Sequence, residues 1–448
     1  MNRYNLFFFP LIAALVWYAC TPSASSFAIE QPENWPVYGG LGSNQYSALN
    51  QINRDNVQQL ELAWQFNSGD KDPQNRTQIQ CNPLIVDGML FGSTPTVKFF
   101  ALNGATGQEI WRFDPFDGAY DQFGMGVNRG VAYWSDGQEA RLLCSAADYL
   151  YCLDAKTGSL MADFGEGGKL NLRLGLGEDA QERFVSGNTP GVVYKDLLIM
   201  GMRVSEGTDA APGFIRAFDV KTGALVWTFH TIPRPGEFGH VTWPEDAWQR
   251  VGGANSWAGV TLDEQRGIVY VPTGSASYDF YGGNRHGDNL FANCVLALDA
   301  TTGERIWHYQ TIHHDLWDRD LPAAPNLVRV THNGQKKDAV AQITKHGYVF
   351  LLDRETGEPL FEVQEVPAPA SSLPGELAAE TQPLPVKPPP FSRQTLDADN
   401  VTNLSPEVRQ WALDSLTKIN PDTDFLPPSR EGTIIFPGFD GGGEWGGA

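Results

Sequence analysis

Short runs of apolar and β-branched residues recur along the chain, and each ends in an aspartate or asparagine that begins a glycine-closed turn. These runs lack the long 3.6-residue periodicity of an amphipathic helix, so the pattern predicts strands. The turn occurs five times, at residues 101–107, 152–158, 217–223, 297–303 and 351–357. In four copies an aromatic residue follows four positions after the glycine, at Trp111, Trp227, Trp307 and Phe361.

The physical basis of this repeat is local. The aspartate or asparagine side chain caps the turn, glycine adopts a backbone angle that other residues resist, and an indole can insert between neighbouring repeats. Five copies predict radial repetition, so we expect an all-β fold, a β-propeller of four-stranded blades. The segment 60–64, which ends in Trp64, is predicted to be a further strand contributed by the N-terminal part.

Two stretches interrupt the repeat. The first lies between the third and fourth turns and contains Trp243, Trp248, Asn255 and Trp257. The second is an insertion at about 364–428, which we interpret as a surface excursion rather than a second domain. Its Pro-rich part, 364–392, is expected to be irregular. It leads into a predicted amphipathic helix at 405–418, capped by Ser405 and begun by Pro406.

Composition and charge narrow the class of protein. The 448 residues include 47 Gly, 30 Pro and 13 Trp, and only 19% are charged, which suits an all-β protein with many tight turns. The formal net charge of -21 argues against nucleic-acid binding, because a phosphate backbone would be repelled. We interpret the acidity as a means of keeping an exported protein soluble.

Residues 1–28 predict an export signal, which leaves 29–448 as one propeller domain. Arg3 precedes an apolar run that is too short to span a bilayer comfortably. Two cleavage positions stay open: after Ala28, or before Cys20, where a lipid anchor would be the only attachment to a membrane. We therefore expect a periplasmic or otherwise exported protein.

The four remaining cysteines are Cys81, Cys144, Cys152 and Cys294, and their spacing fits neither haem attachment nor zinc binding. Cys144 and Cys152 bracket a predicted hairpin, and a disulfide between them requires that their side chains share a face. The favoured interpretation is that these are buried structural cysteines.

The densest group of chemically versatile side chains is His313, His314, Asp315 and Asp318 around a tryptophan, with Lys345 following one short repeat later. A carboxylate held near an aromatic ring and a lysine could act as a general base, a metal ligand or both. Taken alone, such a group is more often a solvated turn, so its surroundings decide.

Several segments resemble one enzyme family: residues 35–40, 46–49, 129–134, 255–257 and 272–275. Through them, and from about residue 35 to 448, the chain is similar to the quinoprotein dehydrogenases that carry pyrroloquinoline quinone (PQQ), especially the glucose/quinate branch. The resemblance implies an eight-bladed propeller, of which this chain would be a C-terminally incomplete piece lacking about two blades. Residues 432–439 are then predicted to be the first strand of a blade cut before its partners.

The resemblance also implies roles for individual residues. Asp318 matches the catalytic base, Lys345 the cation beside the quinone carbonyls, and Trp257 the indole beneath the planar cofactor. Arg129 matches a guanidinium at the cofactor's edge, and Gln80 lies where some relatives place a glutamate. Trp257 alone would be taken for core packing; the joint occurrence of these residues on a propeller favours a site.

For the metal, which would be calcium or magnesium, Asp318 matches a shared carboxylate ligand and Glu206 is the best candidate for another. Ser275 stands where the alcohol-oxidising branch has an asparagine ligand, and Ser277 matches a hydroxyl residue of the glucose branch near the cofactor. A hard dication prefers such carboxylate and neutral oxygens. Alone, Glu206 would be taken for a solvated residue and Ser275 for a turn residue.

The expected activity is oxidation of an alcohol, polyol or sugar hydroxyl by hydride transfer to PQQ. Without a haem motif, electrons would pass to a separate carrier, a quinone or cytochrome c. Phe123 and Gly124 replace the adjacent cysteines of some relatives, and Met125 replaces a histidine of the membrane glucose dehydrogenase, which puts glucose as the substrate in doubt. The alternative is a non-catalytic propeller scaffold of the cell envelope, which would have no reason to keep Asp318 and Lys345 together.

Overall fold

A computed structural model describes residues 34–119, 126–419 and 424–448. The predicted export signal at 1–28, with Cys20, therefore lies outside the described residues, and so do Phe123, Gly124 and Met125.

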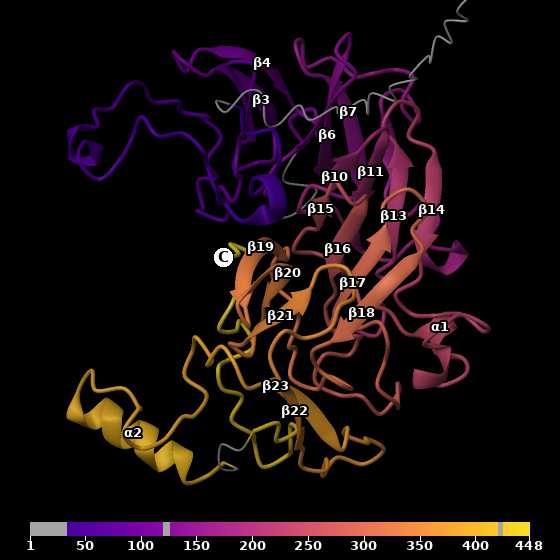
Figure 1. Cartoon of the computed structure of the whole chain (residues 1–448), viewed down its shortest axis with the longest axis vertical. Coiled ribbons are helices and arrows are strands. Elements are labelled where there is room, and N and C mark those ends of the chain that lie inside the picture. Colours follow the sequence, from indigo (N-terminus) through magenta and orange to yellow (C-terminus); the bar gives the residue numbers. More distant parts are fainter. Residues whose placement is uncertain (1–33, 120–125, 420–423) are drawn as a thin grey trace, which may run out of the picture.

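Four four-stranded antiparallel sheets and one three-stranded sheet follow one another around an arc, each built from successive strands (Figure 1). Blade one contains β1 (Leu84–Val86), β2 (Met89–Ser93), β3 (Phe99–Asn103) and β4 (Glu109–Phe113). Blade two contains β5 (Ala132–Ser135), β6 (Ala140–Ala146), β7 (Tyr149–Asp154) and β8 (Lys169–Asn171). Blade three contains β10 (Val192–Tyr194), β11 (Leu197–Met200), β13 (Ile215–Asp219) and β14 (Leu225–Phe229). Blade four contains β15 (Thr261–Asp263), β16 (Ile268–Pro272), β17 (Cys294–Asp299) and β18 (Arg305–Gln310), and blade five contains β19 (Asn326–His332), β20 (Gln335–Ile343) and β21 (Val349–Asp353).

Smaller elements connect or decorate the blades. Two short sheets pair β9 (Val185–Ser186) with β12 (Arg203–Val204), and β22 (Val363–Pro367) with β23 (Thr381–Pro385). The α-helices are α1 (Ala247–Arg250) and α2 (Pro406–Leu416), and single 3-10 turns occur at η1 (Leu41–Ser43), η2 (Val57–Gln59), η4 (Glu178–Ala180) and η5 (His240–Thr242). Across the described ranges, none of these helices has the length and apolar character that a membrane crossing needs.

The repeated turns have the predicted capping. The Asp154 carboxylate accepts hydrogen bonds from the backbone N–H groups of Lys156 (3.0 Å) and Thr157 (2.8 Å). The same two bonds recur in the other four copies, at Asn103, Asp219, Asp299 and Asp353. The chain reverses at each of these points because the side chain satisfies backbone donors that no strand can reach.

The predicted tryptophan wedges are confirmed. Trp111 donates its indole N–H to the carbonyl of Ala155 in the next blade (3.0 Å). Its ring covers Gly158, where an added Cβ would lie 2.6 Å from ring atoms and where φ is +71°. Equivalent contacts join three further tryptophans to the following turns: Trp64 to Gly107, Trp227 to Gly303 and Trp307 to Gly357. Each turn glycine thus allows the indole of the preceding repeat to dock.

The predicted strand at 60–64 is wrong, although Trp64 docks as expected. No strand is assigned to these residues, which are fully described. Leu60 is 59% exposed and Leu62 is 81% exposed, so the segment has no neighbouring strand against which to pair. The apolar residues of this run are exposed, and no strand of the described residues pairs with it.

The hydrophobic core consists of separate clusters between successive blades. Phe91 and Trp111 of blade one pack with Leu142 and Cys144 of blade two, while Cys152 belongs to the cluster shared with blade three. Similar clusters join blades three and four, and blades four and five. In the register of β6 and β7, Cys144 lies opposite Tyr151, so the two cysteines face opposite sides of the sheet. Both are free and buried, which excludes a disulfide between them. Cys294 is also buried, whereas Cys81 is only partly buried, so burial is confirmed for three of the four cysteines.

The insertion is partly more regular than predicted. Within 364–392, which was expected to be irregular, β22 and β23 form an antiparallel pair. The predicted helix is confirmed as α2: Ser405 caps it by accepting a hydrogen bond from the backbone N–H of Val408 (3.2 Å). This helix buries none of its residues and projects from the body of the protein (Figure 1).

The prediction of a strand at 432–439 is wrong. These residues form turns and irregular backbone. Instead of pairing with a neighbouring strand, the carbonyl group of Pro437 accepts a hydrogen bond from the Arg319 side chain (2.8 Å). The apolar residues of this segment pack behind a loop rather than into a sheet.

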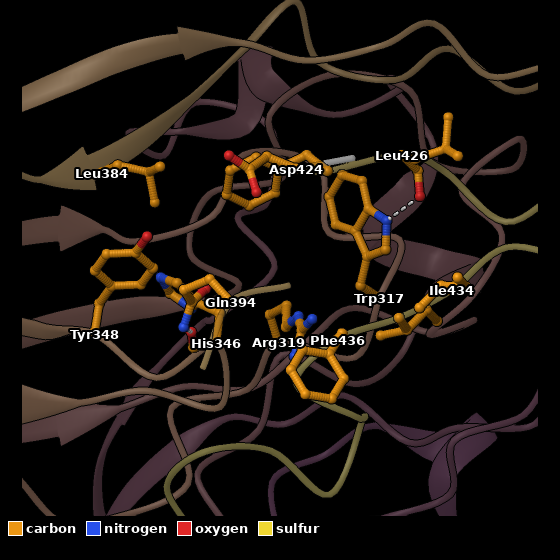
Figure 2. A pocket seen from close by; sticks show the side chains of 12 residues that line it. Trp317, Arg319, His346, Tyr348, Leu384, Gln394, Asp424, Leu426, Ile434 and Phe436 are labelled. Atoms are coloured by element: carbon orange, nitrogen blue, oxygen red, sulfur yellow. Dashed lines mark hydrogen bonds between the residues drawn. The ribbon is translucent and has the colours of Figure 1, made fainter. Parts of the chain in front are cut away.

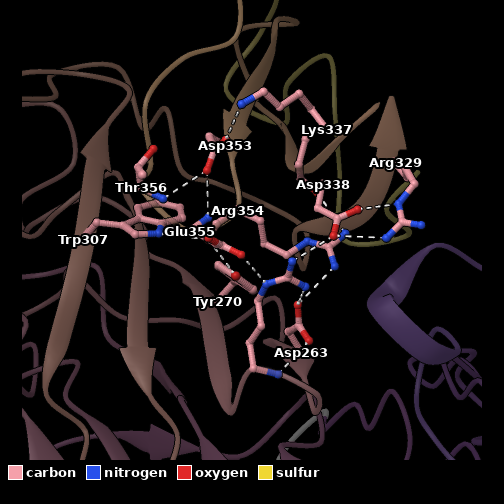
Figure 3. Close-up of polar contacts among 12 residues, drawn as sticks. Asp263, Tyr270, Trp307, Arg329, Lys337, Asp338, Asp353, Arg354, Glu355 and Thr356 are labelled. Atoms are coloured by element: carbon pink, nitrogen blue, oxygen red, sulfur yellow. Dashed lines mark hydrogen bonds and ion pairs between the residues drawn. The ribbon is translucent and has the colours of Figure 1, made fainter. Parts of the chain in front are cut away.

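Blades four and five are tied together by an ionic network (Figure 3). Asp263, which is 5% exposed at the end of β15, accepts hydrogen bonds from Arg266 (3.0 Å) and from Arg354 of blade five (3.1 Å). Arg266 in turn reaches Asp338 of β20 (2.8 Å). Charges buried in such a network are costly to leave without their partners.

We therefore expect Asp263→Asn to lower the free energy of unfolding by about 3 kcal/mol, because Arg354 and Arg266 would lose a buried counter-charge. Urea denaturation measures this loss. The matched control is Lys337→Ala, which removes the exposed 3.8 Å pair with Asp353 drawn in the same view. Exposed pairs of this kind contribute less than about 1 kcal/mol, so equal losses in the two variants would contradict the role of the network.

Candidate active site

The first strands of the blades surround the axis of the arc. Strands β1, β5, β10 and β15 and η1 line a cavity of about 520 Å³ beside the turns that follow these strands, and none of the candidate site residues lines it. The loops that lead into the first strands of blades one to five carry Gln80, Arg129, Thr189, Trp257 and Asp318, respectively. Since these strands enter the sheets in the same sense, the loops meet at one end of the axis.

Arg129 connects four of these loops. Its guanidinium donates hydrogen bonds to Gln80 Oε1 (3.1 Å), Thr189 Oγ1 (3.0 Å) and the Trp257 carbonyl (3.3 Å). The side chain is 6% exposed, and burial lowers the pKa of Arg129 to about 10. It therefore stays a cation at neutral pH, fixed in orientation by three acceptors.

Trp257 presents its indole to two cations. Arg129 Cζ lies 5.3 Å from the ring centroid and Lys345 Nζ lies 5.8 Å from it. The indole N–H donates to Asp320 Oδ2 (2.9 Å), which fixes the plane of the ring. An aromatic surface flanked by positive charge is the environment that a flat anion prefers.

Lys345 is a buried cation between two carboxylates. Its Nζ lies 2.9 Å from Asp318 Oδ2 and 3.4 Å from Asp320 Oδ2. Burial opposes the charge, but the carboxylates of Asp320 and Asp318 hold the pKa of Lys345 above its ordinary value. The lysine is therefore charged throughout the physiological pH range.

The Asp318 carboxylate has a raised affinity for a proton, as a general base requires. Burial, followed by repulsion from Asp320, raises the pKa of Asp318 to about 9, although the Lys345 ammonium acts in the opposite direction. Its backbone has φ +54°, a left-handed conformation that costs a non-glycine residue about 1–2 kcal/mol. Strain of this kind persists only where the surrounding structure holds it in place.

Asp320 is a site residue that sequence analysis missed. It accepts hydrogen bonds from the Trp257 indole (2.9 Å), the Ser275 backbone N–H (2.5 Å) and Lys345. Burial alone would raise the pKa of Asp320, but the Lys345 charge and the two other donors hold it below its ordinary value. Its position two residues after Asp318 is no signal by itself, because the left-handed backbone at Asp318 interrupts the alternation of an extended strand.

The two predicted serines are engaged elsewhere. The Ser275 hydroxyl donates to Asp315 and accepts from Asn293 Nδ2 (3.3 Å). The Ser277 hydroxyl donates to the carbonyl of Ser205 (3.4 Å). Neither hydroxyl is bonded to Asp318, so their predicted roles stay predictions.

Glu206 lies within electrostatic reach of the site. Burial, then repulsion from Asp320 and Glu206, raises the pKa of Asp279 to about 8. Asp279 is 8% exposed and was not singled out in the sequence. Trp445, which sequence analysis did not single out, also joins the site, because Arg129 Cζ lies 4.8 Å from its ring centroid.

The side chains fit a flat anionic cofactor. Two buried cations, Arg129 and Lys345, flank the Trp257 ring, and this donor set suits a planar anion. Among the residues that the structure describes, no group of three or more carboxylate, imidazole or thiolate side chains lies close enough together to coordinate a metal ion. Besides burial, repulsion from Asp320 raises the pKa values of both Asp279 and Asp318, which is the electrostatic condition that a divalent cation would relieve.

The fold is a β-propeller, and its comparison with known proteins gives the class. Residues 35–448 match the family model for the PQQ-containing β-propeller domain of glucose/ethanol/alcohol dehydrogenases. The chain belongs to this PQQ-dependent dehydrogenase family, and the predicted β-propeller fold is confirmed.

Similar proteins include the quinate/shikimate dehydrogenase (quinone) of Acinetobacter baylyi, with 35% identity over 92% of this chain and 54% of the relative. The quinoprotein glucose dehydrogenase of Escherichia coli is 34% identical over 93% of this chain and 54% of its own length. The solved quinohemoprotein alcohol dehydrogenase of Comamonas testosteroni superposes with a TM-score of 0.64 at 28% identity, over 79% of this chain and 52% of that structure. The chain thus spans about half the length of these relatives.

Proposed function

We propose that this chain forms the cofactor-binding part of an exported dehydrogenase that oxidises the hydroxyl group of an alcohol, polyol or sugar. The observation that carries the proposal is the buried Lys345–Asp318 ion pair beside the indole of Trp257, to which Arg129 adds a second cation. Relatives named for quinate, glucose and glycerol all act on hydroxyl-bearing compounds, which supports the substrate class.

Each residue has a distinct task in this proposal. PQQ, when bound, supplies the hydride acceptor. Trp257 supports the planar ring, Arg129 and Lys345 bind its anionic rim, and Gln80 and Ser277 are proposed to complete the surround. Asp318 accepts the hydroxyl proton on a carboxylate oxygen, and Lys345 Nζ stabilises the ionised form of that carboxylate.

A calcium or magnesium ion is proposed to be held by Asp318 with Glu206, and Ser275 is the predicted neutral ligand. The Asp318 and Asp320 carboxylates already repel each other in this region. Hard dications prefer such oxygen ligands, and a bound ion would polarise an oxygen of the reacting groups.

Reconstitution tests the function. The protein is incubated with PQQ and Ca²⁺, passed through a desalting column and examined for a quinone absorbance band that stays with it. Retained protein is then assayed with an artificial electron acceptor against a primary alcohol, a polyol, an aldose and quinate. Loss of the band on the column would favour the non-catalytic scaffold.

In the cell we propose a quinone or cytochrome c as the acceptor, and export with or without a lipid at Cys20.

Calcium added to metal-free protein is expected to raise the midpoint of thermal unfolding, because a divalent cation offsets the repulsion among Asp318, Asp320 and Asp279. At one hundred times its dissociation constant, a ligand adds about 2.7 kcal/mol of stability. Circular dichroism melts after EDTA treatment, with and without Ca²⁺, measure the shift. Glu206→Gln should diminish it and Asp338→Asn, in the interblade network, should leave it unchanged; identical melts with and without Ca²⁺ would rule out the ion.

A further inference from the structure

Three residues adjacent in sequence to Asp318 or Lys345 line a second, smaller cavity behind the site. Trp317 and Arg319 flank Asp318 in the sequence, and His346 follows Lys345. All three line a cavity of about 40 Å³, to whose walls Asp318 and Lys345 do not contribute (Figure 2). A space of this size holds only a few water molecules. A metabolite has no room there, so these walls support the two loops rather than bind a ligand.

The opposite wall of this cavity belongs to residues 424–443, which we call the C-terminal strap. Trp317 donates its indole N–H to the carbonyl of Leu426 (2.9 Å), as Figure 2 shows. Its ring meets Phe425 edge-on, with 5.6 Å between centroids. Since Trp317 is only 3% exposed, loss of either contact would leave a buried group without its partner.

The other neighbour of Asp318 is anchored to the same strap. Arg319, which is 6% exposed, donates to the carbonyl of Pro437 (2.8 Å). Asp318 is thus held from both sides in the chain, at the residue whose φ of +54° needs external support. The strap therefore holds the two residues that flank Asp318.

The strap also holds the partner of Asp318. The Gly442 backbone N–H donates to the Lys345 carbonyl (2.6 Å). Gly441 passes so close that an added Cβ would lie 2.8 Å from Lys345 Cα, and its φ is +89°. Only glycine fits at this position without displacing the lysine. One segment thus supports both halves of the Asp318–Lys345 ion pair.

We propose that the C-terminal strap is a positioning element, which holds Asp318 and Lys345 in the relative arrangement needed for proton abstraction. Trp317, Arg319 and Gly441 act through the two charged residues and are positioning residues. The catalytic meaning of this inference rests on the proposed function. The geometry it predicts at Lys345 is measurable without any activity.

The test is Gly441→Ala in the holoenzyme, with Gly438→Ala as the matched control, because an added Cβ at Gly438 meets no atom within 4 Å. A displacement of about 1 Å at reacting groups can cost about a hundredfold in rate, so we expect Gly441→Ala to lower kcat by about that factor with little change in KM. Amine acylation, followed by mass spectrometry of the folded, cofactor-free protein, should show faster labelling at Lys345 in this variant alone.

Unchanged labelling of Lys345, or faster labelling with unchanged kcat, would overturn the inference. If Gly441→Ala fails to fold, Trp317→Phe takes its place; it keeps the ring but removes the donor to Leu426, and we expect the same two effects with smaller size. Should the unaltered protein oxidise none of the substrates, the proposed function fails, while the labelling comparison still decides whether the strap positions Lys345.

Discussion

Asp318→Asn is expected to lower kcat by about a thousandfold. The amide keeps the shape of the side chain but cannot accept the hydroxyl proton, and positioned bases contribute about 10²–10⁴-fold. PQQ binding should change less, because Trp257, Arg129 and Lys345 remain. Steady-state kinetics with an artificial acceptor, and retention of the quinone band by the variant, measure the two effects separately.

The control for this variant is Asp55→Asn, which neutralises an exposed aspartate outside the site. Its kcat should equal that of the unaltered enzyme. Asp318→Asn with near-normal turnover would remove Asp318 from the role of base. Loss of the quinone band together with activity would instead assign Asp318 to cofactor or metal binding.

Asp320→Ala is expected to weaken cofactor binding by about tenfold to a hundredfold. The substitution leaves the Trp257 indole and the Ser275 N–H without their acceptor, and it removes one of the two counter-charges of buried Lys345. Breaking a buried pair in this way costs about 3–5 kcal/mol. If half of that cost falls on the bound state, PQQ affinity drops by at least about tenfold to a hundredfold.

Two companion variants make this result interpretable. Asp320→Asn keeps an acceptor oxygen for Trp257 but loses the charge, so its affinity for PQQ should fall between those of Asp320→Ala and the unaltered protein. Asp246→Ala removes a carboxylate whose side chain is 63% exposed and should leave the affinity unchanged. Quenching of tryptophan fluorescence during PQQ titration measures all three. Equal affinity in Asp320→Ala and Asp246→Ala would contradict the role assigned to Asp320.

The features that could be predicted from the sequence are those that depend on contacts between residues less than about ten positions apart. The turn caps and the helix cap at Ser405 depend on side chains that bond their own backbone, so pattern and chemistry sufficed. The strands predicted at 60–64 and 432–439 are wrong because an apolar run shows neither whether it is buried nor which segment it contacts. For 432–439 the partner is a loop that contains Arg319.

Some residues of the candidate site could likewise be predicted from the sequence, and others could not. Asp318, Lys345, Trp257 and Arg129 were singled out by their resemblance to a family, and the structure brings them together. Asp320 escaped notice because its importance comes from Trp257, 63 residues earlier, and from Lys345, 25 residues later. Such a role depends on tertiary contacts that no local pattern encodes.

The residues that build the site belong to five different blades, and those blades touch one another through separate apolar clusters. The distance between Arg129 of blade two and Lys345 of blade five therefore depends on the angles at which the intervening blades pack against one another. A small change in the packing angle between any two blades therefore displaces all the blades that follow along the arc. A methyl group removed between blades three and four could thus detune the site at long range, with every catalytic side chain intact.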